Sequence, residues 1–326
     1  MNEYVKSFTK INLWHDAGYK GQGVKIALSD LSATKYNPNW FPNADIVVAP
    51  SEQYRITTDT INQPVSHLGD QIGALLVYAP EAEIHIVSSE PDAKLQYLID
   101  NDIDIYSHST TAAWNNDKNN AQEKAIINAG NLLITAAGNT DDGAFISLGY
   151  KSTWISVGAC KLGNYGDIVR CSYSCFDKTG NSVDALAFSD YQYAGGGTGI
   201  GTSFAAPAFA GMMAVWRGAF KKLHGRKPTY VESNSFIKDN AIPVKDEYPT
   251  STGCGVVVMP SVMKNTIKLW IDSKNVEVNG EKKTIDSAPI ESGGVTRLPI
   301  RDLTALMGYS VAYDKTDRSI TLVKQT

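Results

Sequence analysis

Four polar residues stand in contexts that suit acyl-transfer chemistry. Asp30 ends the apolar run VKIALSD, and Asn139 ends the run LLITAAGN. His67 precedes a small-residue apolar segment, and Ser203 opens the segment GTSFAAPAFAGMMAVW. A serine can attack a carbonyl carbon once a histidine takes its proton, a carboxylate can orient that histidine, and an amide can stabilise the oxyanion. Together, these residue types make a complete acyl-transfer site.

The segment around Ser203 predicts the start of a buried helix. Gly201 and Thr202 precede the serine, and Pro207 follows it by four residues. A proline fits a helix only in its first turn, where backbone N–H groups lack partners inside the helix, so we expect Pro207 there. The free N–H groups and the positive end of the helix dipole would form an anion site beside Ser203. Considered alone, Ser203 is more readily interpreted as a helix-capping serine, because capping is a common role of serine.

His67 is followed by Gly69, Gly73 and Ala74, small residues that would let a helix pack closely behind it. By itself, His67 is also compatible with a hydrogen-bonded core or surface imidazole. The structural interpretation also applies to the other four histidines, His15, His85, His108 and His224. No His/Cys spacing indicates a metal site.

The elements that must position these residues follow an alternating pattern. Strand-like and helix-like runs alternate over the first 260 residues: VKIALSD, ALLVYA, EIHIVSS, KLQYLIDN, DIDIYSHS, AQEKAIINAG, LLITAAGN and WISVGA. This alternation predicts an α/β fold, a parallel sheet with helices on both faces. The carboxyl ends of parallel strands meet at one edge, so Asp30 and Asn139 should emerge there together. Gly130 is expected to end a helix in the left-handed conformation.

The pattern changes near residue 265, which predicts two domains, 1–264 and 265–326. In the second, IKLWID and VEVNG alternate apolar and polar residues, and Asn279-Gly280 predicts a hairpin turn. LPIRDLTALMG predicts a short helix capped by Gly308, and a second hairpin is expected around 315–318. The sequence therefore predicts a small α+β domain after the larger α/β domain.

The motifs of residues 11–262 resemble those of the subtilisin-like serine protease family (subtilases, peptidase S8). The segments that carry the resemblance are WHDAGYKGQGVKIALSD, SHLGDQIGALLVYAPEAEI, AAGN and GTSFAAPAFAG, in the family's order. The resemblance implies that Ser203 is the nucleophile and His67 the general base and then acid. It also implies that Asp30 fixes the imidazole, that Asn139 donates to the oxyanion, and that the reaction is peptide-bond hydrolysis.

The same resemblance implies a substrate-binding set and shows where the chain departs from the family. The implied set is Ser109, Thr110, Thr111, Ala137 and Gly138. Ser-Thr-Thr-Ala at 109–112 replaces the family's Ser-Leu-Gly-Gly. This replacement is expected to narrow the pocket for the substrate residue before the scissile bond, and so to favour small or slim side chains there. Leu31-Ser32 follows Asp30, and Leu68-Gly69 follows His67, where the family has other residues. These departures motivate an alternative: a weakly active or inactive subtilase-fold protein that binds peptides or partners.

Composition limits the classes of partner. The 326 residues carry 30 basic and 34 acidic side chains, a net charge of -4, so no excess positive field would attract nucleic acid. The longest apolar runs are too short to span a membrane. We therefore expect a protein or peptide substrate, with no nucleic acid and no membrane span.

The sequence predicts neither a cofactor nor a metal. The calcium-binding loop of some subtilases is shortened here, and Asp141-Asp142 is interpreted as a solvated acidic turn. The four cysteines lack a paired CxxC spacing and are expected to be reduced core thiols, with one disulfide left open if the protein is exported; they are Cys160, Cys171, Cys175 and Cys254.

Residues 267–323 resemble the small domain called copper amine oxidase N-terminal-like. The NG hairpin, the Pro-x-Arg before the helix and the closing hairpin carry this resemblance. No His or Cys occurs after Cys254, so copper has no suitable ligands here, and a structural or docking module is expected. Such modules are common in secreted and envelope proteins of Gram-positive bacteria, whereas the N-terminus lacks the pattern of a signal peptide. The location, cytoplasmic or outside the cell, therefore stays open.

Overall fold

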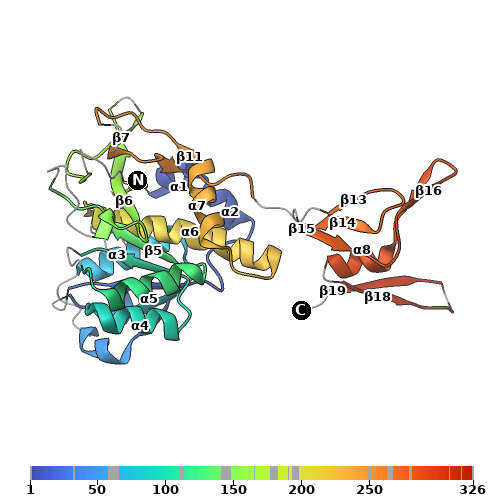
Figure 1. The fold of residues 1–326 in the computed structure, drawn as a ribbon, viewed down its shortest axis with the longest axis horizontal. Coiled ribbons are helices and arrows are strands. Elements are labelled where there is room, and N and C mark those ends of the chain that lie inside the picture. Colours follow the sequence, from blue (N-terminus) through green and yellow to red (C-terminus); the bar gives the residue numbers. More distant parts are fainter. Residues whose placement is uncertain are drawn as a thin grey trace. The chain divides into compact units, whose positions relative to one another are not determined.

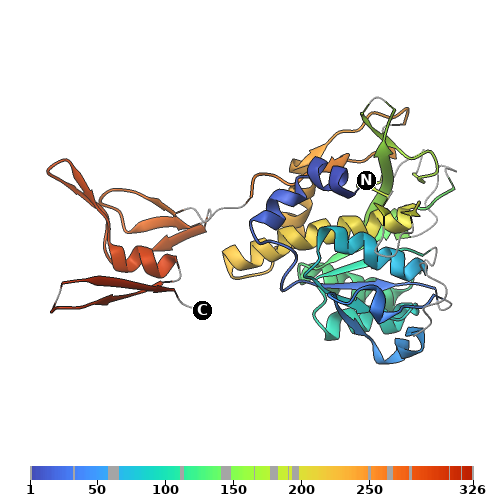
Figure 2. The same ribbon diagram turned by 180° about the vertical axis from the view of Figure 1, so that it is seen from behind.

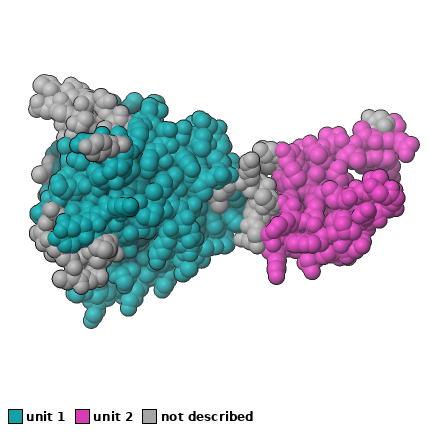
Figure 3. Space-filling view, turned by 90° about the horizontal axis from the view of Figure 1, so that it is seen from above, with its two compact units in different colours: residues 1–262 teal, residues 263–326 magenta. Residues whose placement is uncertain are grey.

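The structure of the chain is a computed structural model that forms two compact units, residues 1–262 and residues 263–326, coloured separately in Figure 3. Asp30, His67, Asn139 and Ser203 all belong to unit 1. The structure describes residues 2–31, 34–57, 66–110, 114–140, 148–164, 166–176, 183–189, 191–192, 198–248, 251–262, 267–278, 281–307, 309–316 and 318–324.

A mostly parallel sheet forms the centre of unit 1 (Figure 1). Its strands are β1 (Lys25–Ser29), β2 (Asp45–Val48), β3 (Glu83–Ile86), β4 (Ile105–His108), β5 (Leu132–Ala136), β6 (Ile155–Leu162), β7 (Ile168–Arg170), β8 (Ala185–Phe188), β11 (Ala241–Ile242) and β12 (Val256–Val257). They lie in the order β11-β12-β8-β6-β5-β4-β1-β3-β2, and β7 pairs with β6. The β11–β12 and β6–β7 pairs are antiparallel, and the other pairs are parallel. A separate hairpin joins β9 (Tyr191–Gln192) to β10 (Thr198–Gly199).

Helices cover both faces of this sheet, as Figures 1 and 2 show from opposite sides. α4 (Pro91–Asp100) and α5 (Asp117–Asn128) pack together on one face, whereas α3 (His67–Tyr78) and α6 (Thr202–His224) pack together on the other. The predicted α/β arrangement is confirmed. The remaining helical segments are α1 (Asn2–Phe8), α2 (Ile11–Asp16), α7 (Tyr230–Asp239), η1 (Pro38–Trp40), η2 (Pro50–Arg55) and η3 (Leu148–Tyr150).

Local capping explains where several helices begin and end. The Ser66 hydroxyl accepts a hydrogen bond from the N–H of Gly69 and so caps the start of α3. Asn116 caps α5 in the same way. Gly130 follows α5 with a φ of 81°, so the left-handed conformation expected there is confirmed.

The start of α6 differs from the prediction in one respect. The helix begins at Thr202, so Pro207 is its sixth residue and lies in the second turn. The expectation that Pro207 lies in the first turn is wrong. Since proline has no N–H, Pro207 cannot donate to the carbonyl of Ser203 four residues earlier, and this carbonyl is left for another donor.

A glycine lets α3 and α6 approach closely. A Cβ added at Gly211 in α6 would lie 2.7 Å from the carbonyl oxygen of Leu75 and 3.1 Å from the Cβ of Tyr78, both in α3. Any larger residue would therefore push the helices apart. This contact matters because His67 begins α3 and Ser203 lies at the start of α6.

Unit 2 has a small core. A three-stranded antiparallel sheet supplies Val276, Val278 and the following Ile285, and Leu306 packs against them. The predicted short helix and closing hairpin are present, whereas the turn at 279–280 and Gly308 lie outside the described residues. The elements are β13 (Ile267–Leu269), β14 (Asn275–Val278), β15 (Glu281–Thr284), β16 (Ile290–Ser292), β17 (Val295–Arg297), α8 (Ile300–Leu306), β18 (Tyr309–Tyr313) and β19 (Ile320–Lys324).

The four cysteines form no disulfide with one another. Cys160, Cys171 and Cys175 are buried, and Cys254 is partly exposed. No helix in the described ranges has the length and apolar character needed to cross a membrane.

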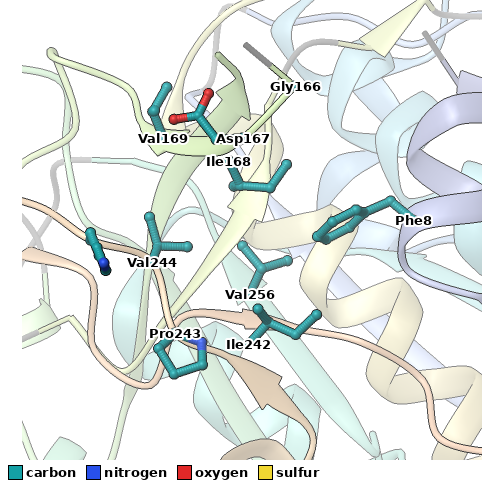
Figure 4. Close-up of a pocket in the computed structure, with 10 residues that line it drawn as sticks. Phe8, Gly166, Asp167, Ile168, Val169, Ile242, Pro243, Val244 and Val256 are labelled. Atoms are coloured by element: carbon teal, nitrogen blue, oxygen red, sulfur yellow. The ribbon is translucent and has the colours of Figure 1, made fainter.

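An apolar pocket of about 380 Å³ lies between the end of α1, β7 and β11, where the side chains of Phe8, Ile168, Ile242 and Val256 gather (Figure 4). None of the predicted site residues lines this pocket.

Candidate active site

The predicted catalytic residues lie at strand ends and helix starts of unit 1. Asp30 directly follows β1, and Asn139 follows β5 by three residues. His67 is the first residue of α3, and Ser203 is the second residue of α6. β1 and β5 both pair in parallel with β4, so their carboxyl ends share one edge, as the sequence predicted.

Asp30 and His67 form a direct pair. The Nδ1 atom of His67 lies 2.8 Å from Oδ2 of Asp30, and the Asp30 side chain is fully buried. An ionised carboxylate only accepts hydrogen bonds, so Nδ1 carries the proton and donates a hydrogen bond to Asp30. In the neutral imidazole, Nε2 is then left as an acceptor, the form that a general base requires.

Two further N–H groups hold the Asp30 carboxylate. The backbone N–H of Leu31 donates to Oδ1 at 2.7 Å. The side-chain amide of Gln71 donates to Oδ2 at 3.0 Å, the same oxygen that His67 contacts. Each oxygen of this buried carboxylate therefore has a donor, which offsets the cost of removing its charge from water.

Neighbouring charges set the proton affinity of His67. Burial lowers its pKa, but the hydrogen bond and charge of Asp30, together with the charge of Asp70, outweigh burial and raise the pKa above the ordinary 6.5. Burial raises the pKa of Asp70 to about 7, against the opposing effect of the His67 charge. Asp70 thus lies in α3, one turn from His67, as a second carboxyl group that influences the imidazole.

The loop after Asp30 is held by an arginine that the sequence analysis did not identify. The buried Arg55 guanidinium donates to the carbonyl oxygens of Asp30, at 2.9 Å, and of Leu31. Its own charge is paired with Glu52. Leu31 is 60% exposed and Leu68 is fully buried. Neither leucine separates Asp30 from His67, because Nδ1 and Oδ2 of that pair are in direct contact at 2.8 Å. Ser32 lies outside the described residues.

Ser203 and Ser109 are joined by reciprocal hydrogen bonds. The Ser109 hydroxyl donates to the Ser203 carbonyl at 2.9 Å, and so satisfies the group that Pro207 leaves without an intrahelical donor. The Ser203 hydroxyl in turn donates to the Ser109 carbonyl at 3.3 Å. Within the described part of the chain, no hydrogen bond joins this hydroxyl to His67, whose ring centroid lies 5.4 Å from that of Phe204. In unliganded sites such hydrogen bonds are often long and tighten on substrate binding.

Asn139 is oriented by the residue that precedes Ser203. Its Oδ1 atom accepts hydrogen bonds from the backbone N–H of Thr202 at 2.8 Å and from the Thr202 hydroxyl at 2.9 Å. The Thr202 hydroxyl also accepts from the N–H of Gly138 at 3.1 Å. The Nδ2 atom of Asn139 remains as a donor, and Gly201 keeps its surroundings open, because an added Cβ would lie 3.3 Å from Nδ2.

The predicted substrate-binding residues are only partly described. Ser109 is buried and participates in the pair with Ser203, and the Thr110 hydroxyl lies 3.3 Å from Nε2 of His108. Ala137 is fully buried, and the Gly138 carbonyl accepts from the N–H of Cys175 at 3.0 Å. Thr111, Ala112, Asp141 and Asp142 lie outside the described residues. Among the residues that are described, no three His, Cys, Asp or Glu side chains converge as metal ligands would.

The comparison with known families decides the identity of unit 1. A model of the subtilase family matches residues 76–255, which is more than half of the chain. The chain belongs to the subtilase family. This match includes Asn139 and Ser203, whereas Asp30 and His67 precede it. A model of the copper amine oxidase N-terminal domain matches residues 255–322. A search of curated proteins finds no match to this subtilase.

Solved structures support the same fold for this subtilase. The prenylagaramide maturation protease PagA shares 16% identity with a TM-score of 0.55, covering 76% of this chain and 94% of that chain. A lanthipeptide protease shares 16% identity with a TM-score of 0.53, covering 78% and 94%. The PatG macrocyclase in complex with a peptide shares 13% identity with a TM-score of 0.60, covering 78% and 95%. At these identities, the likeness establishes the fold alone.

Several residues around the candidate site of this subtilase were missed in the sequence analysis. Asp70 and Gln71 lie three and four residues after His67, so the helix predicted there already placed them on the same face as the histidine. That spacing was the available signal. Arg55 and Thr202 carried no comparable signal, because their roles depend on contacts between separate segments.

Proposed function

We propose that this subtilase is a serine endopeptidase that hydrolyses peptide bonds. Ser203 acts as the nucleophile, His67 as the general base and then acid, Asp30 as the partner of the imidazole, and Asn139 as the oxyanion donor. The observation that carries the proposal is the 2.8 Å contact between Nδ1 of His67 and Oδ2 of Asp30, at the sheet edge where Asn139 also emerges. The family membership supports the same reaction class.

The proposed reaction proceeds through an acyl-enzyme. Ser203 Oγ attacks the carbonyl carbon of the scissile bond while its proton passes to Nε2 of His67. The oxyanion receives hydrogen bonds from Nδ2 of Asn139 and from the backbone N–H of Ser203 in the first turn of α6, because the N–H of Thr202 already donates to Asn139. The imidazolium then gives its proton to the leaving amine, the C–N bond breaks, and a water molecule releases the acyl group by the same steps in reverse.

Peptides are the proposed substrates, bound by Ser109, Thr110, Thr111, Ala137 and Gly138. Two of the similar structures are a maturation protease and a lanthipeptide protease, so precursor peptides are suitable first substrates to test. A third is a macrocyclase. The mass of the product shows whether this protein hydrolyses or cyclises a peptide, because hydrolysis adds one water to the cleaved peptide and cyclisation does not.

A fluorophosphonate probe tests the proposal, because it reacts with an activated serine. We expect a single adduct on Ser203, mapped by mass spectrometry, and no adduct in the Ser203→Ala variant. Absence of labelling in the folded wild-type protein would overturn the proposal. It would instead favour the alternative, a subtilase-fold protein that binds peptides without turnover, in keeping with the Ser203 hydroxyl being directed toward Ser109.

For residues 265–326 we propose a structural or docking module. Many large apolar side chains of this segment are exposed, including Trp270, Val295, Met307 and Ile320. Exposed apolar side chains at this density are typical of surfaces that meet a partner. Pull-down with the module fused to a carrier, compared with a variant in which these four residues are serine, tests the docking role.

A further inference from the structure

Gln71 has an unusual position for a polar side chain. It is fully buried in α3, one helical turn after His67. Its Nε2 atom lies 3.0 Å from Oδ2 of Asp30 and 3.3 Å from Nδ1 of His67. Nε2 of Gln71 and Nδ1 of His67 therefore both contact the same oxygen, Oδ2 of Asp30.

The chemistry of the pair fixes the orientation of this amide. The opposite orientation would place the Gln71 carbonyl oxygen against the negatively charged Asp30 oxygen. Nδ1 of His67 carries a proton that it donates to Asp30, so it cannot accept from Gln71. The N–H of Gln71 consequently serves Asp30.

Burial of this amide has a cost that an apolar residue would avoid. The other polar atom of Gln71, Oε1, is buried without a hydrogen-bond partner among the described residues. A buried carbonyl oxygen without a donor lowers stability. A methionine has nearly the same shape and no such group, so packing alone does not explain a glutamine at this position.

We propose that Gln71 is a positioning residue of the catalytic pair. Its N–H holds the Asp30 carboxylate in the rotamer that directs Oδ2 at Nδ1 of His67. The imidazole then keeps its proton on Nδ1 and presents Nε2 as the acceptor for the Ser203 proton. This inference rests on the proposed endopeptidase function.

The other groups around the pair do not replace this contact. Asp70 also lies in α3 and is an acceptor, so it adds negative charge near His67. Arg55, from η2, donates to the backbone carbonyl of Asp30 and not to its carboxylate. The hydroxyl of Tyr106, in β4, pairs with Ser29, and the Phe204 ring of α6 is apolar. Besides His67 and Gln71, the one described donor to the carboxylate is the backbone N–H of Leu31, and it binds the other oxygen, Oδ1.

The test compares three variants of the full chain, each normalised to active sites titrated with a fluorophosphonate. Gln71→Met removes the donor and keeps the volume, Gln71→Glu keeps the shape and makes the donor depend on pH, and Leu75→Met is a control one turn further along α3. We expect kcat of Gln71→Met to fall about 10- to 100-fold, the factor that a hydrogen bond to a charged group is worth, with KM unchanged. Leu75→Met should match the wild type.

The pH profile separates a positioning role from a structural one. In Gln71→Glu, the introduced carboxyl group is buried beside the Asp30 and Asp70 carboxyl groups, so its pKa rises and it keeps a proton with which it donates to Asp30. It loses this donor as pH rises, and the basic limb of kcat/KM should therefore move to lower pH than in the wild type. A kcat equal to that of the wild type in Gln71→Met, or a basic limb that does not move in Gln71→Glu, would overturn the inference.

A measurement independent of turnover covers the case in which the proposed function fails. In the Ser203→Ala background, ¹⁵N NMR of the imidazoles reports which nitrogen of His67 is protonated. We expect a single Nδ1–H tautomer with Gln71 and a mixture of tautomers with Gln71→Met. The same single tautomer in both proteins would refute the positioning role, whereas failure of wild-type labelling by the probe would refute the endopeptidase function alone.

Discussion

At the scale of single residues, the Asp30 carboxylate is the point on which the candidate site depends. It receives N–H groups from His67, Leu31 and Gln71, and the first of these orients the imidazole. Asp30 and His67 are recognisable in the sequence from their contexts. Gln71 is not, because an apolar and a polar residue at that position fit the helical pattern equally well.

Asn139→Ala should give a folded enzyme with a much lower kcat. The variant loses the Nδ2 donor to the oxyanion, and kcat should fall by about 10²–10³, the effect of removing the corresponding amide of subtilisin. KM should change little, because the interaction forms in the transition state. Steady-state kinetics with a peptide substrate measures this, and turnover equal to that of the wild type would remove Asn139 from the site.

Asp70→Asn should shift the pH dependence of activity to lower pH. The charge of Asp70 raises the pKa of His67, so its removal lowers that pKa and the neutral imidazole persists further into the acidic range. The acidic limb of kcat/KM, measured from pH 5 to pH 9, should move accordingly. Asp92→Asn, which changes an exposed carboxylate on α4, serves as the control with an unchanged profile.

The same substitution should change how stability depends on pH. The pKa of Asp70 is about 7 in the folded protein, whereas the ordinary value for an aspartate, taken for the unfolded chain, is 3.8. The folded state therefore binds this proton more tightly than the unfolded chain. This contribution to stability is fully present below pH 3.8 and is lost as pH rises through about 7. Urea unfolding at pH 8 should show Asp70→Asn more stable than the wild type. A lower stability at that pH would contradict the assignment.

At the scale of elements, the contact between α3 and α6 brings His67 and Ser203 to the same part of unit 1. Gly211 allows this approach, because its missing side chain leaves room for the Leu75 carbonyl. The small residues of α3 already indicate close packing in the sequence. The contact made by the glycine of α6 is not predictable in this way, since helix propensity alone disfavours a glycine there.

Gly211→Ala should destabilise unit 1 and displace the catalytic residues. The added Cβ would lie 2.7 Å from the Leu75 carbonyl oxygen, so the helices must separate. The free energy of unfolding should fall by about 1–3 kcal/mol, as for other overpacked core positions, and kcat should fall with it. Urea unfolding measures the first effect. Gly225→Ala, at the C-cap of α6, is a control with open space around its Cβ but a positive φ, so only stability should change.

At the scale of the whole molecule, the chain divides after residue 262 into two units with different cores. The described core of unit 1 includes long helices against a ten-stranded sheet, whereas the buried apolar cluster of unit 2 consists of Val276, Val278 and Ile285. A core of this size contributes little burial energy. Unit 1 should therefore fold without unit 2, and unit 2 should be the less stable part.

Deletion of residues 263–326 tests this prediction. The fragment 1–262 should fold cooperatively, with a melting temperature and a fluorophosphonate labelling rate equal to those of the full chain. Every residue proposed for catalysis is in unit 1, so kcat for short peptides should also be retained. Loss of labelling in a folded fragment would show that unit 2 contributes to the site.

The sequence by itself determined the class of fold and the four residues whose side chains suit acyl-transfer chemistry. Alternating strand and helix patterns are local consequences of side-chain periodicity, and the motifs around Asp30, His67, Asn139 and Ser203 are contiguous in the chain. Both can therefore be recognised without knowing which segments meet.

Only the tertiary structure decided how those residues are held. The Asp30–Gln71 and Asn139–Thr202 contacts, the pairing of Ser109 with the Ser203 carbonyl, and the position of Pro207 in the second turn depend on distances within and between packed elements. A hydrogen bond between segments 63 to 94 residues apart leaves no periodic trace in the sequence, because it is set by the crossing of helices and the register of strands. The chemistry was thus visible in single motifs, and its geometry arose from packing.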